Sequence, residues 1–514
     1  MSFNKKPSGA STVGVDIGTN QIKVVEVKSG KDGLQVAGYG IAPTPAGSID
    51  NEVIVDPKTL SQALRQVLSD SGISCKRCVS LISGQSSVIV RIIEVPKMTR
   101  EELAETMQWE IERHVPFSKD EVVMDFAPIE REESAEEEQN MEVLLAVAQQ
   151  DAVNSHIETL FLAGLDPVAL DIEYLSACRM LIDASPNSEL KEESVALVNI
   201  GASTTQMGVF RSGLLAFPRI LPIAGDTITR AISEQLGISI EDAELLKCEQ
   251  GQVMIDRIAP RGQTVNLDDG GEPDSFGMGM DFNLEDTQQD LGVGGNLGFI
   301  PNLGGYGLPE EPESEDSSAE ADGAEDIVPV PVKPLVDFDL PAFDTGSEAN
   351  LPEEAEPSID PLDAPQDANS IFDQGDFASV FDSHPDIAKE DDELAPIDST
   401  SLGLDVTSHY TKEQVFDAMA TVLEELISEI HRSLEYYSSS SQDHPQRVIL
   451  FGGTAKMPGI DKYLESELGI KVELADPLQE LNISTKVAEQ DTLQDDILSM
   501  PSCIGLAIRD MIGD

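Results

Sequence analysis

One short phrase occurs twice in this chain, as Val15-Asp16-Ile17-Gly18-Thr19 and as Val198-Asn199-Ile200-Gly201-Ala202. Each copy follows an apolar run of strand length, contains turn-forming residues, and leads into a second apolar or β-branched run. The pattern therefore predicts a β-hairpin twice, over 13–27 and 196–210, rather than a strand that opens directly into a helix. Two equivalent hairpins indicate a chain built from two related halves.

The turns of both hairpins have the chemistry of a phosphate site. Glycine has no Cβ, so Gly18 and Gly201 would let backbone N–H groups approach phosphate oxygens closely. Thr19, Ser203 and Thr204 add hydroxyl donors, and Asp16 would face a bound Mg²⁺ through water. A single glycine hairpin is often only a turn without a ligand, but two copies favour two phosphate loops.

A third glycine loop lies near the end of the chain. The apolar strand 447–451 runs into Gly452-Gly453-Thr454-Ala455-Lys456, and a helical pattern follows over 460–468. A strand, a double glycine and a helix suit a backbone that lies against an adenosine. Neither GxGxxG nor GxxxxGK[ST] spacing occurs, which argues against dinucleotide-binding and P-loop folds.

In their order along the chain, the three loops resemble the phosphate and adenosine loops of the actin-like ATPase superfamily. Three further stretches, 95–98 (Val-Pro-Lys-Met), 109–117 and 125–128 (Asp-Phe-Ala-Pro), are similar to the PilM family of FtsA-like type IV pilus assembly proteins. The resemblance covers roughly 12–251 and 409–510. It implies an α/β fold of two actin-like lobes with duplicated RNase H-like halves and an FtsA-type extra subdomain, with ATP and Mg²⁺ as ligands.

The loops and the resemblance together give a set of expected nucleotide-binding residues. Glu244 and Lys247 are included because relatives touch ribose and adenine there, although a solvated i,i+3 ion pair is the plain alternative. Asn199 stands where many relatives carry Asp, and an amide cannot supply the charge that helps to hold Mg²⁺. The full set is Asp16, Gly18, Thr19, Asn20, Lys23, Asn199, Gly201, Ser203, Thr204, Gly225, Glu244, Lys247, Gly452, Gly453, Thr454 and Lys456.

Catalysis is less well marked in the sequence. Asp171 or Glu173 occupies a connecting segment where a water-positioning carboxylate is found in relatives, and the alternative is a surface acid at a strand edge. With Asn199 in the second loop, we expect ATP binding with slow turnover at most, so that the nucleotide acts as a conformational ligand.

Most of the acidic excess lies in one segment. Residues 252–408 contain 38 Asp and Glu against 4 Lys and Arg, a net charge of −34 out of −62. The segment is rich in Gly, Pro and Ser, so it is predicted to be a disordered insertion that repels nucleic acid. Its Phe-containing clusters at 274–276, 336–340 and 371–373 either do nothing or dock onto basic grooves of partner proteins.

The remaining chain divides into a split two-lobed core. Thr99 and Glu102 form a capping box before a helix that Pro116 stops, and strands follow at 122–126 and 143–147. Trp109 on that helix is interpreted as a core anchor, with a partner-binding groove as the alternative. The expected divisions are a flexible terminus 1–11, first lobe 12–94, extra subdomain 95–170, return to the first lobe 171–195, second lobe 196–251, insertion 252–408, and second lobe with a closing helix 409–514.

The resemblance to PilM implies a cytoplasmic scaffold that binds the N-terminal cytoplasmic tail of a PilN-like inner-membrane protein. No secretory or membrane-spanning run is visible, so we expect attachment to the inner membrane through that partner. Other pilus proteins would meet the acidic insertion, and homo-oligomers are left open. The alternatives are an FtsA-like division protein, and a sugar kinase, for which no general-base Asp or sugar pocket is identified.

Overall fold

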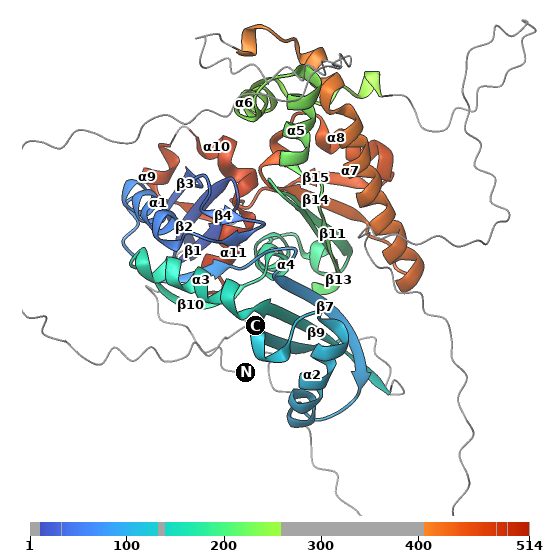
Figure 1. Cartoon of the computed structure of the whole chain (residues 1–514). Coiled ribbons are helices and arrows are strands. Elements are labelled where there is room, and N and C mark those ends of the chain that lie inside the picture. The colour runs from blue at the N-terminus through green and yellow to red at the C-terminus, as the bar shows by residue number, and fades with distance from the viewer. Residues whose placement is uncertain are drawn as a thin grey trace, which may run out of the picture. The chain divides into compact units, whose positions relative to one another are not determined.

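The computed structural model describes residues 11–31, 33–131, 139–258, 406–479, 481–490 and 492–512. The first lobe is built on a six-stranded sheet of order β10-β6-β1-β2-β3-β16, shown with its helices in Figure 1. β1, β2 and β3 form an antiparallel meander, whereas β6 and β10 run parallel to β1. The strands are β1 Ser11–Ile17, β2 Gln21–Gly30, β3 Gly33–Pro43, β6 Arg77–Leu81, β10 Asp166–Asp171 and β16 Asn482–Ile483, and the helices are α1 Pro57–Asp70 and α3 Gln150–Leu162.

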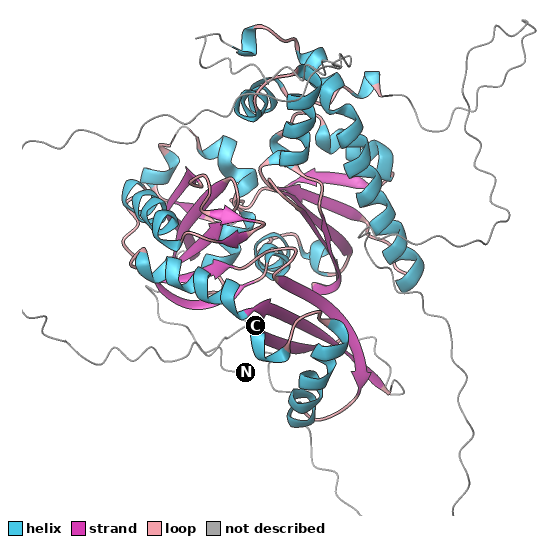
Figure 2. Cartoon of the chain, in the orientation of Figure 1, coloured by secondary structure: helices cyan, strands magenta, loops and turns pink. Residues whose placement is uncertain are grey.

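The second lobe repeats this arrangement. Its five-stranded sheet has the order β13-β12-β11-β14-β15, in which an antiparallel meander of three strands is extended by two parallel strands (Figure 2). The sheet therefore matches β3-β2-β1-β6-β10 strand for strand, as the duplicated phrase predicts. Its elements are β11 Ser194–Ile200, β12 Thr205–Arg211, β13 Leu214–Leu221, β14 Arg447–Phe451, β15 Lys471–Leu474, α5 Gly225–Leu236, α6 Ile240–Gln250, α7 Lys412–Ser441 and α8 Ile460–Leu468.

The sequence accounts locally for most of these elements. β1 and β11 are buried almost throughout, because helices cover both faces of each sheet, and both are accordingly rich in apolar residues, interrupted by Asp16 and Asn199 near their ends. α7 begins at a capping box in which the Thr411 hydroxyl and the Gln414 side chain satisfy each other's backbone N–H groups. Its buried stripe then follows helical spacing through Met419, Leu426 and Ile430.

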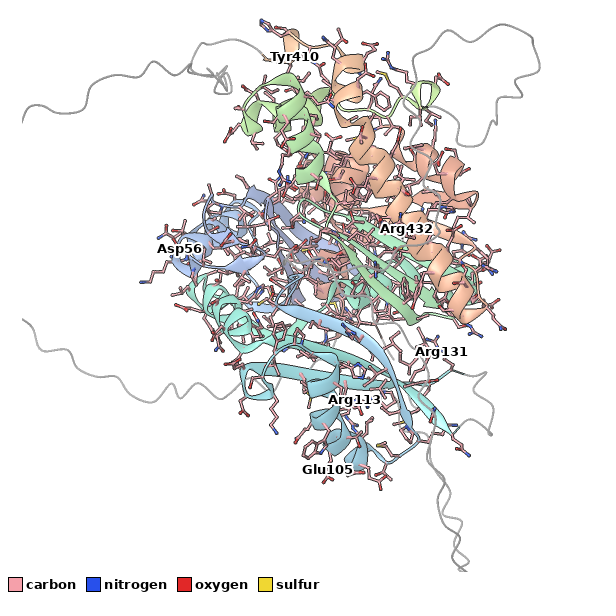
Figure 3. The ribbon with its side chains drawn as sticks, turned by 45° about the vertical axis from the view of Figure 1, so that its right-hand side comes forward. Asp56, Glu105, Arg113, Arg131, Tyr410 and Arg432 are labelled. Carbon is pink, nitrogen blue, oxygen red and sulfur yellow. The ribbon has the colours of Figure 1, made fainter. Side chains whose placement is uncertain are left out.

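A small subdomain interrupts the first lobe. Its sheet has the order β7-β9-β8 and carries α2, whose Leu103, Met107 and Ile111 are buried on one face. Glu105 and Arg113 lie on the outer side of α2 (Figure 3), and Trp109 is 68% exposed. The prediction of a core anchor at Trp109 is therefore wrong, because it lies off the i, i+4 stripe that faces the sheet. The elements are β7 Val88–Pro96, α2 Arg100–His114, β8 Val122–Ile129 and β9 Asn140–Gln149.

The end of the described chain returns to the first lobe. β16 pairs in parallel with β3, and α11 packs on β1, β2 and β6. A Cβ on Gly14 would lie 1.9 Å from the carbonyl oxygen of Cys503, so glycine allows this close approach of helix and strand. The assignment of all of 409–514 to the second lobe is therefore wrong for residues after 481. The elements are α9 Thr485–Ala488, α10 Leu493–Asp496 and α11 Pro501–Ala507.

Three other predicted boundaries shift. The small sheet spans 88–149, so the extra subdomain begins before 95, and α3 and β10 that follow it pack in the first lobe, so it ends before 170. The described chain continues past 252, where the backbone N–H of Val253 donates to the carbonyl of Pro458 at 2.8 Å. Residues 259–405, with the predicted disorder and Phe clusters, lie outside the described residues. Among the described helices, none is long and apolar enough to cross a bilayer.

Candidate nucleotide site

Loops from both lobes line one cavity of about 250 Å³. All three predicted glycine loops contribute to it, together with residues of α6. Of the sixteen residues predicted to bind nucleotide, fifteen line the cavity, and the backbone N–H of the sixteenth, Gly225, donates to the carbonyl of the lining residue Gly201 at 3.1 Å. The fifteen are Asp16, Gly18, Thr19, Asn20, Lys23, Asn199, Gly201, Ser203, Thr204, Glu244, Lys247, Gly452, Gly453, Thr454 and Lys456.

The two phosphate hairpins turn in the same way. The backbone N–H of Gly18 donates to the carbonyl of Gln21 at 3.0 Å, and that of Gly201 donates to Thr204 at 3.1 Å. A Cβ on Gly18 would lie 3.1 Å from the Gln21 oxygen, and one on Gly201 would lie 2.9 Å from the Thr204 oxygen. Both turns are thus tight enough to favour glycine, and they bring Thr19 Oγ1 within 3.4 Å of Ser203 Oγ across the cavity.

The first hairpin carries a buried charge pair. Lys23 Nζ lies 2.7 Å from Asp16 Oδ2, and the two residues face each other in the register of β1 and β2. Burial lowers the pKa of the Lys23 ammonium, but the attraction and hydrogen bond of Asp16 outweigh it and raise that pKa above its ordinary value. The pair fixes a carboxylate and an ammonium at the floor of the cavity, where an anionic ligand and its cation would meet both.

The second and third loops are bound to each other. Thr454 Oγ1 donates to the carbonyl of Gly201 at 2.8 Å, and a Cβ on Gly225 would lie 2.6 Å from that hydroxyl oxygen. Gly452 has φ +104°, and a Cβ there would lie 2.3 Å from Asn199 Oδ1. These glycines are required by close packing, whereas a Cβ on Gly453 would meet nothing within 4 Å and would point into open space.

Glu244 and Lys247 on α6 form an ion pair of 2.6 Å, with the Lys247 side chain only 10% exposed. Lys247 Nζ also donates to Thr229 Oγ1 at 2.8 Å and to the carbonyl of Gly225 at 3.1 Å. The i,i+3 ion pair is therefore present, with its Lys247 end buried and its Glu244 side chain 33% exposed. α6 is tied to the first turn of α5, beside the cavity.

Asp171 and Glu173 are both buried, so the alternative of surface acids is wrong for each. Asp171 Oδ2 lies 2.9 Å from Arg179 Nη1, away from the cavity lining. Glu173, the first residue of α4 (Glu173–Cys178), lines the cavity and accepts hydrogen bonds from Ser502 and Asn199. Burial and the neighbouring Asp16 carboxylate raise the pKa of Glu173 to about 7.

Several lining residues were not predicted from the sequence, and Glu52, Ser502 and His156 are the ones with notable contacts. Glu52 lies in the turn between β4 (Ile49–Asp50) and β5 (Val53–Ile54), and Ser502 lies in α11. His156 Nε2 lies 2.8 Å from Ser80 Oγ, and burial lowers the pKa of this imidazole to about 4. No spacing marks these residues, since each meets the loops only through tertiary packing.

The residues that line the cavity suit a magnesium nucleotide because they offer hydrogen-bond donors to its phosphates, and not because they form a complete set of metal ligands. Two glycine turns, three hydroxyls and Lys23 offer donors to phosphates, and Asp16 offers a carboxylate. Among the described residues, no group of three or more His, Cys, Asp or Glu is placed to hold a metal ion. A divalent cation would therefore depend on phosphate oxygens for part of its coordination.

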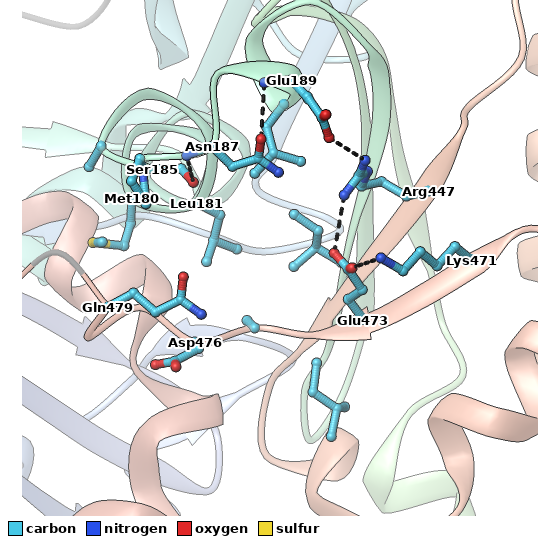
Figure 4. Close-up of a pocket in the computed structure, with 16 residues that line it drawn as sticks. Met180, Leu181, Ser185, Asn187, Glu189, Arg447, Lys471, Glu473, Asp476 and Gln479 are labelled. Carbon is cyan, nitrogen blue, oxygen red and sulfur yellow. Dashed lines mark hydrogen bonds and ion pairs between the residues drawn. The ribbon is translucent and has the colours of Figure 1, made fainter.

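A second cavity of about 550 Å³ lies between residues 180–190, which follow α4, and the strands β14 and β15 (Figure 4). None of the glycine loops lines it. Its cations are paired: Arg447 Nε lies 2.7 Å from Glu193, and Lys471 pairs with Glu473. Because its lining lacks the glycine turns and their closely approaching backbone N–H groups, this cavity is less suited to a triphosphate than the first one.

Two duplicated lobes with paired phosphate hairpins and a third glycine loop at one cavity define an actin-like ATPase fold. A family model described as type IV pilus assembly protein PilM matches residues 14–253, and the model for cell division protein FtsA matches residues 196–495. The FtsA match alone spans more than half of the chain. The chain therefore belongs to the PilM and FtsA family of actin-like ATPases.

Individual relatives agree with this assignment. The chain is 25% identical over 268 residues to FtsA of Bacillus subtilis (48% of this chain, 59% of that protein). It is 23% identical over 290 residues to FtsA of Pseudomonas aeruginosa (52% and 66%). The matches thus span about three fifths of these relatives' length. The solved structure of a PilM-PilN type IV pilus biogenesis complex matches with a TM-score of 0.61 at 21% identity, over 98% of this chain and 99% of that one.

Proposed function

We propose that this protein binds Mg-ATP in the glycine-loop cavity and serves as an actin-like scaffold of type IV pilus assembly. The observation that carries the nucleotide part is the convergence of all three glycine loops on one cavity from segments far apart in the sequence. The match to the PilM model over 14–253 supports the pilus part. Asp16 would act on Mg²⁺ through water, and Lys23 would neutralise phosphate charge.

Nucleotide binding is tested by thermal and chemical unfolding with Mg-ATP. At a free concentration of about 100 times Kd, linkage stabilises the folded state by about 2.7 kcal/mol. Gly453→Asp puts a carboxylate into open space in the cavity and should abolish this gain, because it repels phosphates without steric conflict. Gly453→Ala is the matched control and should keep it. If Mg-ATP has no effect on wild-type unfolding at any concentration, the nucleotide site is refuted.

Turnover should be slow. Glu173 lines the cavity and, with a pKa of about 7, is partly ionised at neutral pH, so it is the better candidate than Asp171 to position a water. We expect Glu173→Gln to lower phosphate release while Mg-ATP still stabilises the protein. Asp171→Asn breaks the buried ion pair with Arg179 and is expected to act on folding instead.

For the partner, we propose the N-terminal cytoplasmic tail of a PilN-like inner-membrane protein, which would hold this chain at the membrane. The exposed Trp109, with Lys119 Nζ 5.7 Å from its ring centroid, makes α2 a candidate contact surface. A synthetic tail peptide should bind with micromolar or better affinity, and Trp109→Ala should weaken it more than tenfold (on the order of 1.4 kcal/mol or more). Tyr436→Ala, which removes a 64% exposed aromatic side chain from α7 of the second lobe, serves as the control and should leave the affinity for the peptide unchanged.

The FtsA model match over 196–495 favours a second candidate, a division scaffold. The two functions differ in which proteins accompany the chain. Purifying this protein from the native membrane decides between them, because either pilus proteins or division proteins will co-purify. Co-purified division proteins, together with no measurable binding of the tail peptide, would favour the second function.

A further inference from the structure

The second phosphate loop already holds an anion that belongs to the protein itself. Ser203 Oγ and Thr204 Oγ1 both donate hydrogen bonds to Glu52 Oε1, at 2.8 and 3.1 Å. The other carboxylate oxygen, Oε2, accepts the backbone N–H of Gln85 at 2.6 Å. Glu52 therefore reaches from the first lobe and uses the two hydroxyls that this loop would offer to a phosphate.

The backbone at Glu52 is unusual for a residue with a side chain. Asn51 and Glu52 form the two-residue turn between β4 and β5, with φ of +46° and +63°. A two-residue turn with both φ values positive has the signs of a type I′ turn, in which Asn suits the first position and Gly the second. Glutamate is disfavoured there because its Cβ crowds the backbone. The structure nevertheless places in this turn the side chain that contacts the second phosphate loop.

The Glu52 carboxylate occupies the hydroxyl groups of the second loop in the way that a phosphate would. Carboxylate and phosphate oxygens accept the same hydrogen bonds, and hydrogen bonds to a charged acceptor are stronger than those to a neutral one. Glu52 lines the same cavity as Gly18 and Gly201, so a phosphate at the second loop would also meet a like charge.

We propose that Glu52 is an internal competitor for the second phosphate loop, which nucleotide must displace. This inference rests on the proposed binding of nucleotide. Without nucleotide, the carboxylate satisfies the loop hydroxyls and links the β4–β5 turn to the second lobe. With nucleotide, the phosphates take Ser203 and Thr204, and the strained turn is released. Glu52 thus lowers the affinity for phosphate-bearing ligands and couples the turn to nucleotide occupancy.

The test measures Mg-ATP affinity by calorimetry in the full chain. Glu52→Gln removes the charge with little change of shape, and Glu52→Gly removes the competitor and suits the backbone. Both should tighten Mg-ATP binding, by about tenfold for Gly. Glu105→Gln, an exposed glutamate on α2, controls for the loss of one negative charge and should leave the affinity unchanged.

A double-mutant cycle tests whether the effect of Glu52 on Mg-ATP affinity acts through the hydroxyls of Ser203 and Thr204. In a Ser203→Ala, Thr204→Ala background the hydroxyls are absent, so the gain from Glu52→Gly should largely disappear, leaving only the removal of like-charge repulsion. The same cycle on urea unfolding without nucleotide should show coupling between residue 52 and the two hydroxyls. That second readout does not depend on any ligand.

The outcomes separate the two proposals. If wild type and all variants fail to bind Mg-ATP, the proposed function is overturned. If wild type binds but the Glu52 variants bind equally or more weakly, the internal competitor is overturned and the nucleotide site stands. Tighter binding that persists unchanged without the hydroxyls would also overturn it, since Glu52 would then act through long-range charge alone.

Discussion

The two glycine hairpins have the same backbone arrangement and differ in the charge of the side chains that they present. Asp16 faces Lys23 in the register of β1 and β2, and Asn199 faces Gln206 at the equivalent position of β11 and β12. The first hairpin therefore presents a charge pair, and the second presents amides at the same register. The difference continues at the turns, where Ser203 and Thr204 bind the carboxylate of Glu52.

The two copies of the hairpin thus have the same turn but different side-chain charges. A glycine turn supplies close backbone approach in both halves, but only the first hairpin supplies formal charge at this register. If the second hairpin also had an acid at 199, it would lie beside Glu173, whose pKa is already raised by burial and by Asp16. An amide at 199 can donate to that carboxylate instead, which limits the negative charge buried between the lobes.

Breaking the charge pair of the first hairpin should have the largest effect. Asp16→Ala leaves the Lys23 ammonium buried without its carboxylate, and we expect a loss of about 3–5 kcal/mol in the free energy of unfolding, measured in urea. Asp16→Asn combined with Lys23→Gln copies the neutral pair of the second hairpin and should recover most of that loss. A double variant as unstable as Asp16→Ala would show that the hairpins are not equivalent.

A pH series at Glu173 tests the buried acid between the hairpins. Its pKa of about 7 lies above the ordinary 4.5, so the folded state holds a proton that the unfolded state releases, and stability falls as the pH rises from about 4.5 to 7. Glu173→Gln removes this dependence and should stabilise the protein by about 3 kcal/mol at pH 8, with little gain at pH 4. Parallel stability curves for the two proteins would contradict the shift.

Restoring an acid in the second hairpin should have the smallest effect on folding. Asn199→Asp adds a carboxylate beside Glu173, so we expect a further rise in the pKa of Glu173 and a loss of about 1 kcal/mol at pH 8 that disappears near pH 4. Mg-ATP affinity should become more dependent on Mg²⁺, as titrations at several Mg²⁺ concentrations would report. An unchanged Mg²⁺ dependence would mean that position 199 has no influence on the cation.

Much of the fold could be predicted because many of its elements depend on short stretches of the sequence. The hairpins, the strand and helix around Gly452, and the capped starts of α2 and α7 depend on β-branched runs, turn residues and capping boxes within about ten residues. Trp109 and the described residues after 481 were misplaced. The local stripe of Leu103, Met107 and Ile111 already leaves Trp109 off the buried face of α2, whereas no local pattern shows that β16 joins β3 across more than four hundred residues.

The sequence by itself determined that two glycine hairpins and a third glycine loop exist, because a turn without a Cβ is a local requirement of the backbone. Only the tertiary structure decided that they face one cavity, and that Glu52, Glu173 and Ser502 join them there. Those side chains meet through the packing of two lobes and a returning terminal helix. Contacts over such separations are set by which apolar faces bury each other, and no local pattern encodes them.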